Sequence, residues 1–439
     1  MPAPPRYHET AIPVRAEPAL AMAHLARSGP WRAYAAYEHA SHWAFAGDPI
    51  AEITVDRDAV HLRQGRSSQS RPWRDSPLAT VAQLLEEAGP RRWRAYGWAA
   101  FELSYLGTPL FDTVGSQTLL HLIVPGTEVR LENGQARVRS TSAAAADRVR
   151  RLLATPADEP RHAAKPADIH SDASSYLDMV EAVVQEIRRR QLSKVVLSRT
   201  LMLSHRIDLV GTYVNGRRNN TPARSFLLDI GGIQAAGFSP EIIVHVTAAG
   251  RVVTQPLAGT RALTGCARHD EALRADLLAD PKEVFEHSVS VRAAFDELAG
   301  VCHPGTVTVE RFMDVQERGS VQHLASQVAG RLPAGRNAWH AFAAAFPAVT
   351  VTGVSKTAAL ASIHRHEQTP RGLYGGAVLT VDADGSMDAA LALRAVFQQN
   401  GRAWLRAGAG IVGHSRPERE WQETCEKLHS VAPYLVPAN

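Results

Sequence analysis

The chain has 439 residues, of which 45% are hydrophobic and 21% charged, and its formal net charge is +4. These proportions are those of a soluble globular protein, and the length permits one large domain or about three smaller ones. The three scattered cysteines argue against a disulfide framework, and no uncharged apolar stretch is long enough to span a membrane.

Residues 1–155 are predicted to form short strands and turns with few helices, as the N-terminal part of the fold. Within them, Arg94–Phe101 is predicted to be a buried strand. Residues 156–174 are rich in Pro, Ala, Asp and His without periodicity, which predicts a loop. Residues 175–439 then carry the candidate catalytic part, and we expect the whole chain to make one compact structural domain.

Clear helix and strand signals follow residue 175. Apolar residues repeat at helical spacing from Tyr176 to Ile187. The basic run Arg188–Arg190 is predicted to be a solvated helix end rather than a nucleic-acid patch, because no aromatic residues are interleaved with it. Lys194–Leu201 is predicted to be a strand, and residues 225–257 an antiparallel meander. Strands outnumber crossover helices, so the predicted fold class is α+β with large antiparallel sheets.

The helix predicted after Asp280 carries a pair of glutamates near its start. Asp280 is a favourable N-cap, and Pro281 suits the first turn. Glu283 and Glu286 follow, three residues apart, and therefore share one helix face.

The helix that closes the chain carries a second pair with the same spacing. Ser415 and Glu418 are spaced as a capping box at its start. Glu420 and Glu423 share a face that Lys427 extends by one turn. Glutamates at a helix start often lie in water, where they favour the helix dipole, and that explanation suffices for either pair alone. Two pairs on two helices can instead enclose one hard cation, and oxygen-rich sites of this kind suit Mg²⁺.

Four single residues have both a functional and a structural explanation. Lys194 is one of only five lysines in the chain. It is either a catalytic base or a residue at a strand edge whose ammonium group reaches into water. Glu241 is either an acid or an exposed turn residue. His323 is either part of a site or a satisfied core histidine, and Tyr374 is either part of a site or a residue that closes a hairpin. Spacing alone does not assemble these residues into one site.

Gly408–Gly413 spells GxGxxG between a predicted strand and a predicted helix, which is the dinucleotide-binding pattern. A Rossmann unit needs a second parallel strand and an acidic residue about 20 positions further on. The sequence ends at Asn439, so we do not expect a nicotinamide enzyme. Backbone amides beside a helix start can hold a carboxylate, and a plain tight turn is an equal alternative.

Taken together, nine ordered segments resemble the chorismate-utilising enzymes, and among these most closely the salicylate synthases of siderophore pathways. The resemblance is dense from about Tyr176 to Tyr434 and thinner before it. The segments are Lys194–Arg199, Gly237–Glu241, Pro256–Arg261, Lys282–His287, Ser320–His323, Arg371–Tyr374, Leu393–Arg394, Gly408–Gly410 and Pro417–Lys427.

The resemblance implies two large antiparallel sheets packed together, with helices outside and an active-site cleft between them. It also implies chorismate, which carries a ring carboxylate and an enolpyruvyl carboxylate, as the substrate. The implied cofactor is Mg²⁺, held by Glu286 and Glu423, with Glu283 and Glu420 supporting it through water. The implied substrate-binding residues are Gly259, Thr260, Tyr374, Arg394, Gly408, Ala409, Gly410 and Lys427.

The implied reaction adds water at one ring carbon while hydroxide leaves another, which requires a base and an acid. The resemblance assigns the base to Lys194, which must be neutral when it acts, and the acid to Glu241, which must hold its proton. Thr260 is placed with these catalytic residues. His323 is implied to assist the later loss of pyruvate from isochorismate.

Two positions favour this branch of the family. Ammonia-using relatives typically carry glutamine in place of Lys194, so lysine favours water as the nucleophile and no glutaminase subunit is expected. Covalent-type aminodeoxychorismate synthases carry lysine where Ala258 stands. Gly413–His414 departs from the more acidic residues expected in the salicylate branch.

The leading hypothesis is therefore a Mg²⁺-dependent isomerase and lyase that converts chorismate through isochorismate to salicylate and pyruvate. We expect a cytoplasmic location, because the N-terminal residues lack the apolar run of a signal peptide. We also expect a monomer. Two alternatives stay open: an isochorismate synthase that stops before pyruvate elimination, and a non-catalytic anion-binding protein on the same scaffold.

Overall fold

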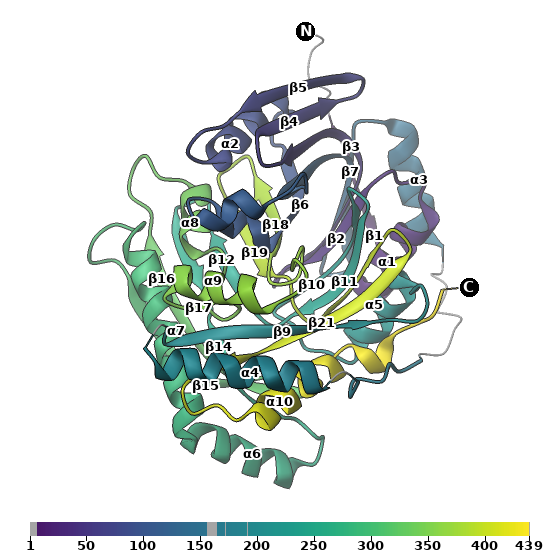
Figure 1. Cartoon of the computed structure of the whole chain (residues 1–439). Helices are drawn as coiled ribbons and strands as arrows, with labels where there is room; N and C mark the ends of the chain where they lie inside the picture. Colours follow the sequence, from purple (N-terminus) through teal and green to yellow (C-terminus); the bar gives the residue numbers. More distant parts are fainter. Residues whose placement is uncertain (1–6, 156–164, 172, 191, 439) are drawn as a thin grey trace.

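Antiparallel strands form the framework of the fold in the computed structural model, which describes residues 7–155, 165–171, 173–190 and 192–438 (Figure 1). The strands in this part of the chain are β1 His8–Pro13, β2 Tyr34–Glu38, β3 Trp43–Val55, β4 Ala59–Gln64, β5 Ser67–Pro72, β6 Arg94–Ala99, β7 Leu120–Glu132, β8 Gln135–Ser140, β9 Lys194–Met202, β10 Arg224–Ile230, β11 Ile233–Ser239, β12 Ile242–Val246, β13 Arg251–Thr254, β14 Leu257–Ala262, β15 Thr308–Arg318, β16 Val321–Arg331, β17 Gly353–Val354, β18 Ala377–Asp382, β19 Met387–Leu391, β20 Ala395–Gln399 and β21 Arg402–Ile411.

The strand network has two arms, which meet where β3 pairs with β7. One arm continues from β3 through β2, β10, β11, β20, β21 and β9 to β17. The other continues from β7 through β6, β18, β19, β12 and β13 to β16, which also pairs with β14 and β15. The predicted class, α+β with large antiparallel sheets, is confirmed, and the two expected sheets correspond to the two arms of one continuous network.

The N-terminal residues contribute strands to both arms. Strand β2 pairs with β10, where Tyr37 lies opposite Phe226, and β6 pairs with β18, where Trp98 lies opposite Val378. The loop expected at residues 156–174 falls largely outside the described residues, because 156–164 and 172 are not among them.

Ten α-helices and three short 3₁₀ helices in the described residues surround the strands. They are α1 Pro18–Ser28, α2 Pro77–Ala88, η1 Phe101–Tyr105, η2 Pro109–Thr113, α3 Ala143–Ala154, α4 Ala173–Arg188, α5 Leu209–Arg218, α6 Ala267–Ala279, α7 Pro281–Ala299, α8 Ala338–Ala345, α9 Lys356–His366, α10 Pro417–His429 and η3 Ala432–Tyr434. Helices α4 and α10 lie along β9 and β21 in Figure 1, and α7 packs on β14 and β16. Among the described helices, none combines the length and apolar composition needed to cross a bilayer.

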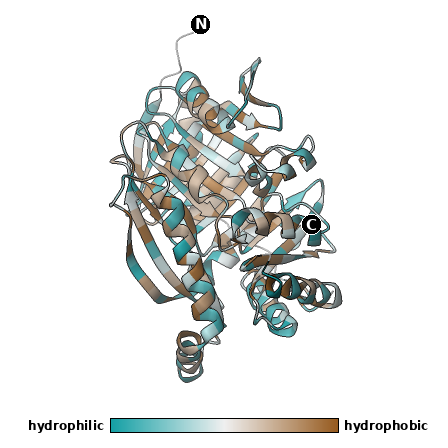
Figure 2. Cartoon of the chain, turned by 60° about the vertical axis from the view of Figure 1, so that its left-hand side comes forward, coloured by the Kyte–Doolittle hydropathy of each residue, from teal (hydrophilic) through white to brown (hydrophobic). Residues whose placement is uncertain are grey.

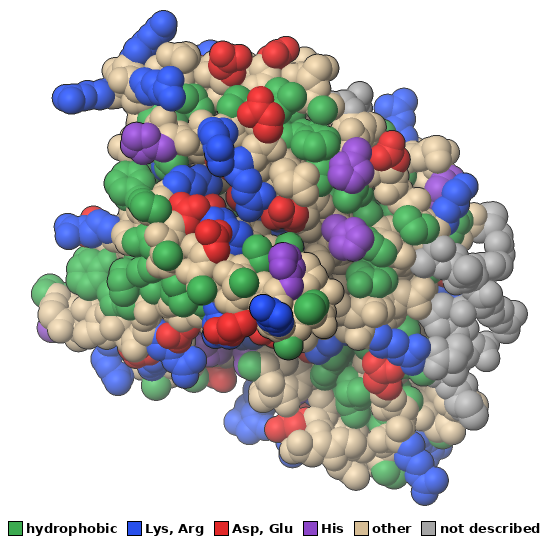
Figure 3. Space-filling view, turned by 90° about the horizontal axis from the view of Figure 1, so that it is seen from below, with side chains coloured by type: hydrophobic (Ala, Val, Ile, Leu, Met, Phe, Trp, Pro, Cys, Tyr) green, Lys and Arg blue, Asp and Glu red, His purple; other side chains and the backbone are tan. Residues whose placement is uncertain are grey.

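Hydrophobic residues concentrate on the strands in the middle of the molecule, whereas the outer helices alternate apolar and polar residues (Figure 2). The face seen from below in Figure 3 carries acidic and basic side chains interspersed rather than a patch of one sign. Lys194 is an exception to this division, because it is a charged residue that is fully buried in the interior. A buried ammonium group is costly unless a buried polar or charged group contacts it.

Candidate active site

A cavity with an empty volume of about 600 Å³ lies between the two arms. Strands β9 and β21 of one arm and β14 and β16 of the other contribute to its walls, together with α7 and α10. Its lining residues are Val196, Pro240, Glu241, Leu257, Ala258, Gly259, Thr260, Glu286, His323, Thr350, Val351, Tyr374, Leu393, Arg394, Arg406, Ala407, Gly408, Gly410, Glu423 and Lys427. Most of the residues implied by the resemblance therefore meet in one place.

Helix α7 begins as the sequence predicts. The Asp280 side chain accepts hydrogen bonds from the backbone amides of Lys282 and Glu283, and Pro281 follows the cap. Further along the same helix, Val291 and Leu298 are buried, so its inward face carries glutamates at the start and apolar residues beyond.

Helix α10 has the same inward arrangement but a different start. Glu420 and Glu423 are buried near its beginning and Leu428 near its end. The predicted capping box is wrong: Arg416 occupies the N-cap without a side-chain hydrogen bond. Ser415 instead accepts a hydrogen bond from the Val412 amide, because the chain turns sharply between β21 and α10.

The two glutamate pairs converge in the interior rather than lying in water. Glu283, Glu286, Glu420 and Glu423 are only 2%, 4%, 1% and 3% exposed. This excludes the solvent-exposed explanation of either pair. Burial raises the pKa of Glu283 and raises that of Glu420 to about 7. Burial acts in the same direction on Glu286 and Glu423, but nearby lysine ammonium groups outweigh it and lower both pKa values.

Each of these carboxylates has a cationic neighbour. The ion pairs are Lys194–Glu286 at 3.0 Å, Arg261–Glu283 at 2.9 Å, Lys427–Glu423 at 2.7 Å and Lys282–Glu420 at 3.3 Å. Even so, several buried carboxylate oxygens have no hydrogen-bond partner among the described residues. They are Oε2 of Glu283, Glu286 and Glu423 and both oxygens of Glu420. Buried oxygens left in this state fit a hard, oxygen-seeking cation such as Mg²⁺.

The glycine-rich segment is shaped by this cluster. Gly408 and Gly410 belong to strand β21 and pair with β9, so the GxGxxG pattern is not the loop of a dinucleotide site. A Cβ atom at Gly410 would lie 2.0 Å from Oε1 of Glu286, so any larger residue would displace that carboxylate. Lys427 donates a hydrogen bond to the Gly408 carbonyl, at 2.9 Å. Ala409 does not line the cavity, and its amide donates to the Tyr176 hydroxyl at 3.3 Å.

Glu241 lies on the cavity wall and is 3% exposed. Burial raises its pKa to about 8, although the Thr350 hydroxyl, which donates to Oε1 at 2.6 Å, acts in the opposite direction. The carboxyl is therefore protonated at neutral pH and has the state that a general acid requires. Spacing alone left an acid and an exposed turn residue as alternatives for Glu241, because its burial comes from segments distant in the sequence.

His323, Arg394 and Gly259 form a second group in the cavity. Nδ1 of His323 lies 3.1 Å from the Gly259 carbonyl, which can only accept, so Nδ1 carries the hydrogen. Nε2 then accepts from Nη2 of Arg394, at 3.0 Å. Burial and the neighbouring Arg394 charge hold the pKa of His323 well below its usual value, so the ring is neutral. In this geometry His323 orients Arg394.

Arg394 is built to meet an anion. Its backbone has φ +50°, an uncommon conformation for a residue other than glycine that tends to occur at functional sites. Nη1 is buried without a hydrogen-bond partner in the described structure. Tyr374 lines the same cavity, and burial raises its pKa to about 12, so its hydroxyl keeps its proton and can donate.

Lys194 lies behind the cavity wall rather than on it. The residue is fully buried, and Nζ donates to the Ser290 hydroxyl at 2.8 Å and pairs with Oε1 of Glu286 at 3.0 Å. A base needs a free lone pair, whereas both of these contacts engage Nζ. The role of Lys194 as a base stays a prediction.

Sequence reasoning missed Arg406, which lines the cavity from β21. Its Nε donates to the Ser198 hydroxyl at 2.8 Å and its Nη2 to Glu367 at 2.6 Å. The available signal was an arginine inside an otherwise apolar strand. It also missed Lys282, whose ammonium group lies among Glu283, Glu286 and Glu420.

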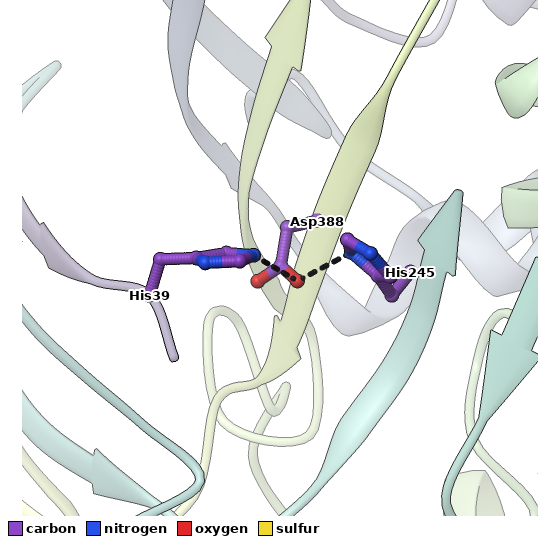
Figure 4. A group of neighbouring side chains, drawn as sticks. All are labelled: His39, His245 and Asp388. Carbon is purple, nitrogen blue, oxygen red and sulfur yellow. Dashed lines mark hydrogen bonds and ion pairs between the residues drawn. The ribbon is translucent and has the colours of Figure 1, made fainter. Parts of the chain in front are cut away.

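A separate set of possible metal ligands lies outside the cavity, formed by His39, His245 and Asp388 (Figure 4). Asp388 Oδ2 lies 3.5 Å from Nε2 of His39 and 3.0 Å from Nδ1 of His245. Arg224 donates to both oxygens of Asp388, at 2.7 and 2.8 Å, and the Tyr37 hydroxyl donates at 2.5 Å. A guanidinium group bound to the same oxygens would repel a metal ion, so this set is an ion-pair network between strands.

Comparison with known proteins agrees with this geometry. The family model described as chorismate binding enzyme matches residues 31–433. The chain is 41% identical over 429 residues to the salicylate synthase of Mycolicibacterium paratuberculosis, covering 97% of this chain and 95% of that protein. It is 37% identical over 270 residues to anthranilate synthase component 1 of Spirochaeta aurantia, covering 62% of this chain and 56% of that protein.

Solved structures resemble it as well. Anthranilate synthase component I from Streptococcus pneumoniae superposes with a TM-score of 0.74 at 27% identity, over 90% of this chain and 92% of that one. The menaquinone-specific isochorismate synthase from Escherichia coli, at 22% identity, shares the fold with a TM-score of 0.74 over 99% of this chain and 96% of that one. Because the family model covers nearly the whole chain, the protein belongs to the family of chorismate binding enzymes.

Proposed function

We propose that the protein is a Mg²⁺-dependent salicylate synthase, which converts chorismate to isochorismate and then to salicylate and pyruvate. The observation that carries this proposal is a single cavity lined by a protonated acid, Glu241, by Arg394, whose Nη1 has no hydrogen-bond partner in the described structure, and by the buried carboxylates Glu286 and Glu423. Similarity to a salicylate synthase over 97% of the chain supports the choice within the family.

Binding of the dianionic substrate divides between two ends of the cavity. Arg394 and Tyr374 would hold the enolpyruvyl carboxylate, with Arg394 oriented by His323. Glu286 and Glu423 would hold Mg²⁺, which when bound supplies positive charge for the ring carboxylate. Without a cation, the carboxylates of α7 and α10 would repel a substrate of the same sign.

The first step exchanges one ring hydroxyl for another. Lys194, in its neutral form, takes a proton from a water molecule whose oxygen bonds to a ring carbon. The hydroxyl at another ring carbon takes the proton of Glu241 and leaves as water. The number of atoms is conserved, so the product, isochorismate, is an isomer of the substrate.

The second step breaks the carbon–oxygen bond to the enolpyruvyl group. A hydrogen leaves the neighbouring ring carbon for the departing group, and an aromatic ring remains. His323 is neutral and both of its nitrogens are engaged, so its contribution here is to position Arg394 rather than to move a proton. We propose a single-chain monomer without a glutaminase subunit, whose salicylate serves siderophore or other secondary-metabolite biosynthesis.

Incubation of the purified protein with chorismate, with Mg²⁺ or with chelator, tests the proposal. We expect Mg²⁺-dependent salicylate fluorescence and pyruvate in equal amounts by chromatography. Isochorismate without salicylate would support an enzyme that stops after the first step. Unchanged chorismate in the presence of Mg²⁺ would refute catalysis and favour an anion-binding protein.

A further inference from the structure

The Lys282 ammonium group lies inside the acidic cluster of α7 and α10. Its Nζ is 3.2 Å from Glu286 Oε2, 3.3 Å from Glu420 Oε1 and 3.6 Å from Glu283 Oε1. None of these contacts has hydrogen-bond geometry, and Nζ is buried without a hydrogen-bond partner in the described residues. The three carboxylates thus surround a positive charge without directional bonds, as they would surround a metal ion.

The position of Lys282 in the helix makes this placement unusual. It lies in the first turn of α7, where the helix dipole disfavours a cation and favours acidic residues. Burial also disfavours the charged form, but the four glutamates outweigh it and hold the pKa of Lys282 well above its usual value. The carboxylates are therefore what keeps this charge in place.

The same oxygens cannot serve Lys282 and a divalent ion at once. Oε2 of Glu286 and Oε1 of Glu420 are two of the oxygens that lack a hydrogen-bond partner and that we assigned to the metal and its water shell. In the described residues, the four glutamates do not bring three ligand atoms within 4.8 Å of one another, whereas His39, His245 and Asp388 do. The acidic cluster is spread around the ammonium group rather than closed to metal-binding distances.

We propose that Lys282 is a tethered counter-ion, which occupies the cation position when Mg²⁺ is absent and swings outward when Mg²⁺ binds. This inference rests on the proposed use of Mg²⁺. The lysine side chain is flexible and 15% exposed although its Nζ is buried, so part of the side chain already reaches the surface. Lys282 thus keeps four buried carboxylates from repelling one another in the metal-free protein and lowers the affinity for Mg²⁺ alone.

Charge balance gives this exchange a consequence for substrate binding. In the metal-free cluster, four carboxylates face the cationic groups of Lys194, Lys282, Lys427 and Arg261. Exchange of the Lys282 ammonium group for a divalent ion raises the charge of the cluster by one, which is the charge that the ring carboxylate of the substrate neutralises. Metal and substrate should therefore bind cooperatively.

Calorimetric titration of Mg²⁺ into Lys282→Met, without chorismate, tests the exchange. Methionine keeps an unbranched side chain, one atom shorter, and removes the charge, so we expect affinity for Mg²⁺ to rise by at least about tenfold over the unmodified protein. Lys356→Met is the matched control, because Lys356 pairs with Glu297 at 2.8 Å outside the site. An affinity for Mg²⁺ that is unchanged, weaker or absent in Lys282→Met would overturn the proposal.

Lysine acetylation read by mass spectrometry separates displacement from a simple change of charge. The chain has only five lysines, so each can be followed on its own peptide. We expect labelling of Lys282 by an N-hydroxysuccinimide acetate to increase several-fold in Mg²⁺ over chelator, while Lys356 stays constant. Constant or decreased labelling of Lys282 would overturn the proposal. Neither measurement uses chorismate. A protein that makes no salicylate from chorismate would therefore refute the proposed function without changing the outcome of these two tests of Lys282.

Discussion

Two buried charge clusters in this protein differ in whether their carboxylates are satisfied. Asp388 accepts hydrogen bonds from Arg224, Tyr37 and His245, and its arginine and histidine neighbours outweigh burial and hold its pKa well below the usual value. Figure 4 shows its contacts with the two histidines. In the acidic cluster of α7 and α10, Oε1 of Glu423 accepts a hydrogen bond from Lys427, but Oε2 of Glu423 and both oxygens of Glu420 have no hydrogen-bond partner within the described structure.

This difference in hydrogen bonding distinguishes charged groups that stabilise the fold from charged groups that are available to bind a ligand. A buried ion pair with complete hydrogen bonding holds strands together and has no capacity left for another group. A buried cluster with free oxygens is costly for the folded protein unless something else binds there. The two clusters should therefore respond in opposite ways when one carboxylate is removed.

The largest effect is expected for Glu423→Gln. The amide keeps the shape of the side chain but removes the carboxylate charge that we propose binds Mg²⁺. Turnover of chorismate should therefore fall below detection, while the melting temperature changes little. Salicylate fluorescence and thermal denaturation measure the two. Full activity in this variant would show that the acidic cluster is structural, like that of Asp388.

Lys194→Ala should lower the rate of water addition by about 10²–10⁴-fold, the range that a general base contributes. The product assay is chromatography of isochorismate and salicylate at saturating Mg²⁺. Lys356→Ala removes an ion pair outside the site and is the control for loss of a lysine. An unchanged rate in Lys194→Ala would reject its role as base.

Asp388→Asn should show the opposite pattern to Glu423→Gln. Removing one partner of a buried ion pair leaves Arg224 unpaired, so the free energy of unfolding should fall by about 3–5 kcal/mol. Urea denaturation measures this change, and affinity for Mg²⁺, measured by calorimetry, should stay the same. A loss of Mg²⁺ affinity without a loss of stability would reverse our assignment of the two clusters.

The pH dependence of kcat/KM reports on Glu241. Its pKa is raised to about 8, so the acid form is present below that pH and is lost above it. Activity should decline about tenfold per pH unit on the alkaline side of pH 8. The rate should be proportional to the protonated fraction, and a flat profile from pH 7 to pH 10 would exclude Glu241 as the acid.

The smallest effect is expected for His323→Asn. Loss of the acceptor for Arg394 should weaken chorismate binding by about tenfold, the value of one hydrogen bond to a charged group. The change should lie in KM, because His323 orients Arg394 and does not move a proton. A large fall in kcat with unchanged KM would instead indicate direct proton transfer by His323.

Local patterns predicted most of the elements that carry the site. The strand at Lys194, the helix capped by Asp280 and the pairing of glutamates at three-residue spacing depend on near neighbours in the chain, and all are present. The capping box at Ser415 and Glu418 was wrong, because Ser415 is engaged by the turn that precedes α10.

The sequence by itself determined the α+β class, the family and the chemical types of the candidate residues, since these depend on order, spacing and resemblance. Only the tertiary structure decided which glutamates are buried, that Glu241 keeps its proton and that Lys282 lies among the carboxylates. Burial and long-range charge come from segments far apart in sequence. The 3.3 Å contact between Lys282 and Glu420, which are separated by more than a hundred residues, exists only after the two arms have closed around the cavity.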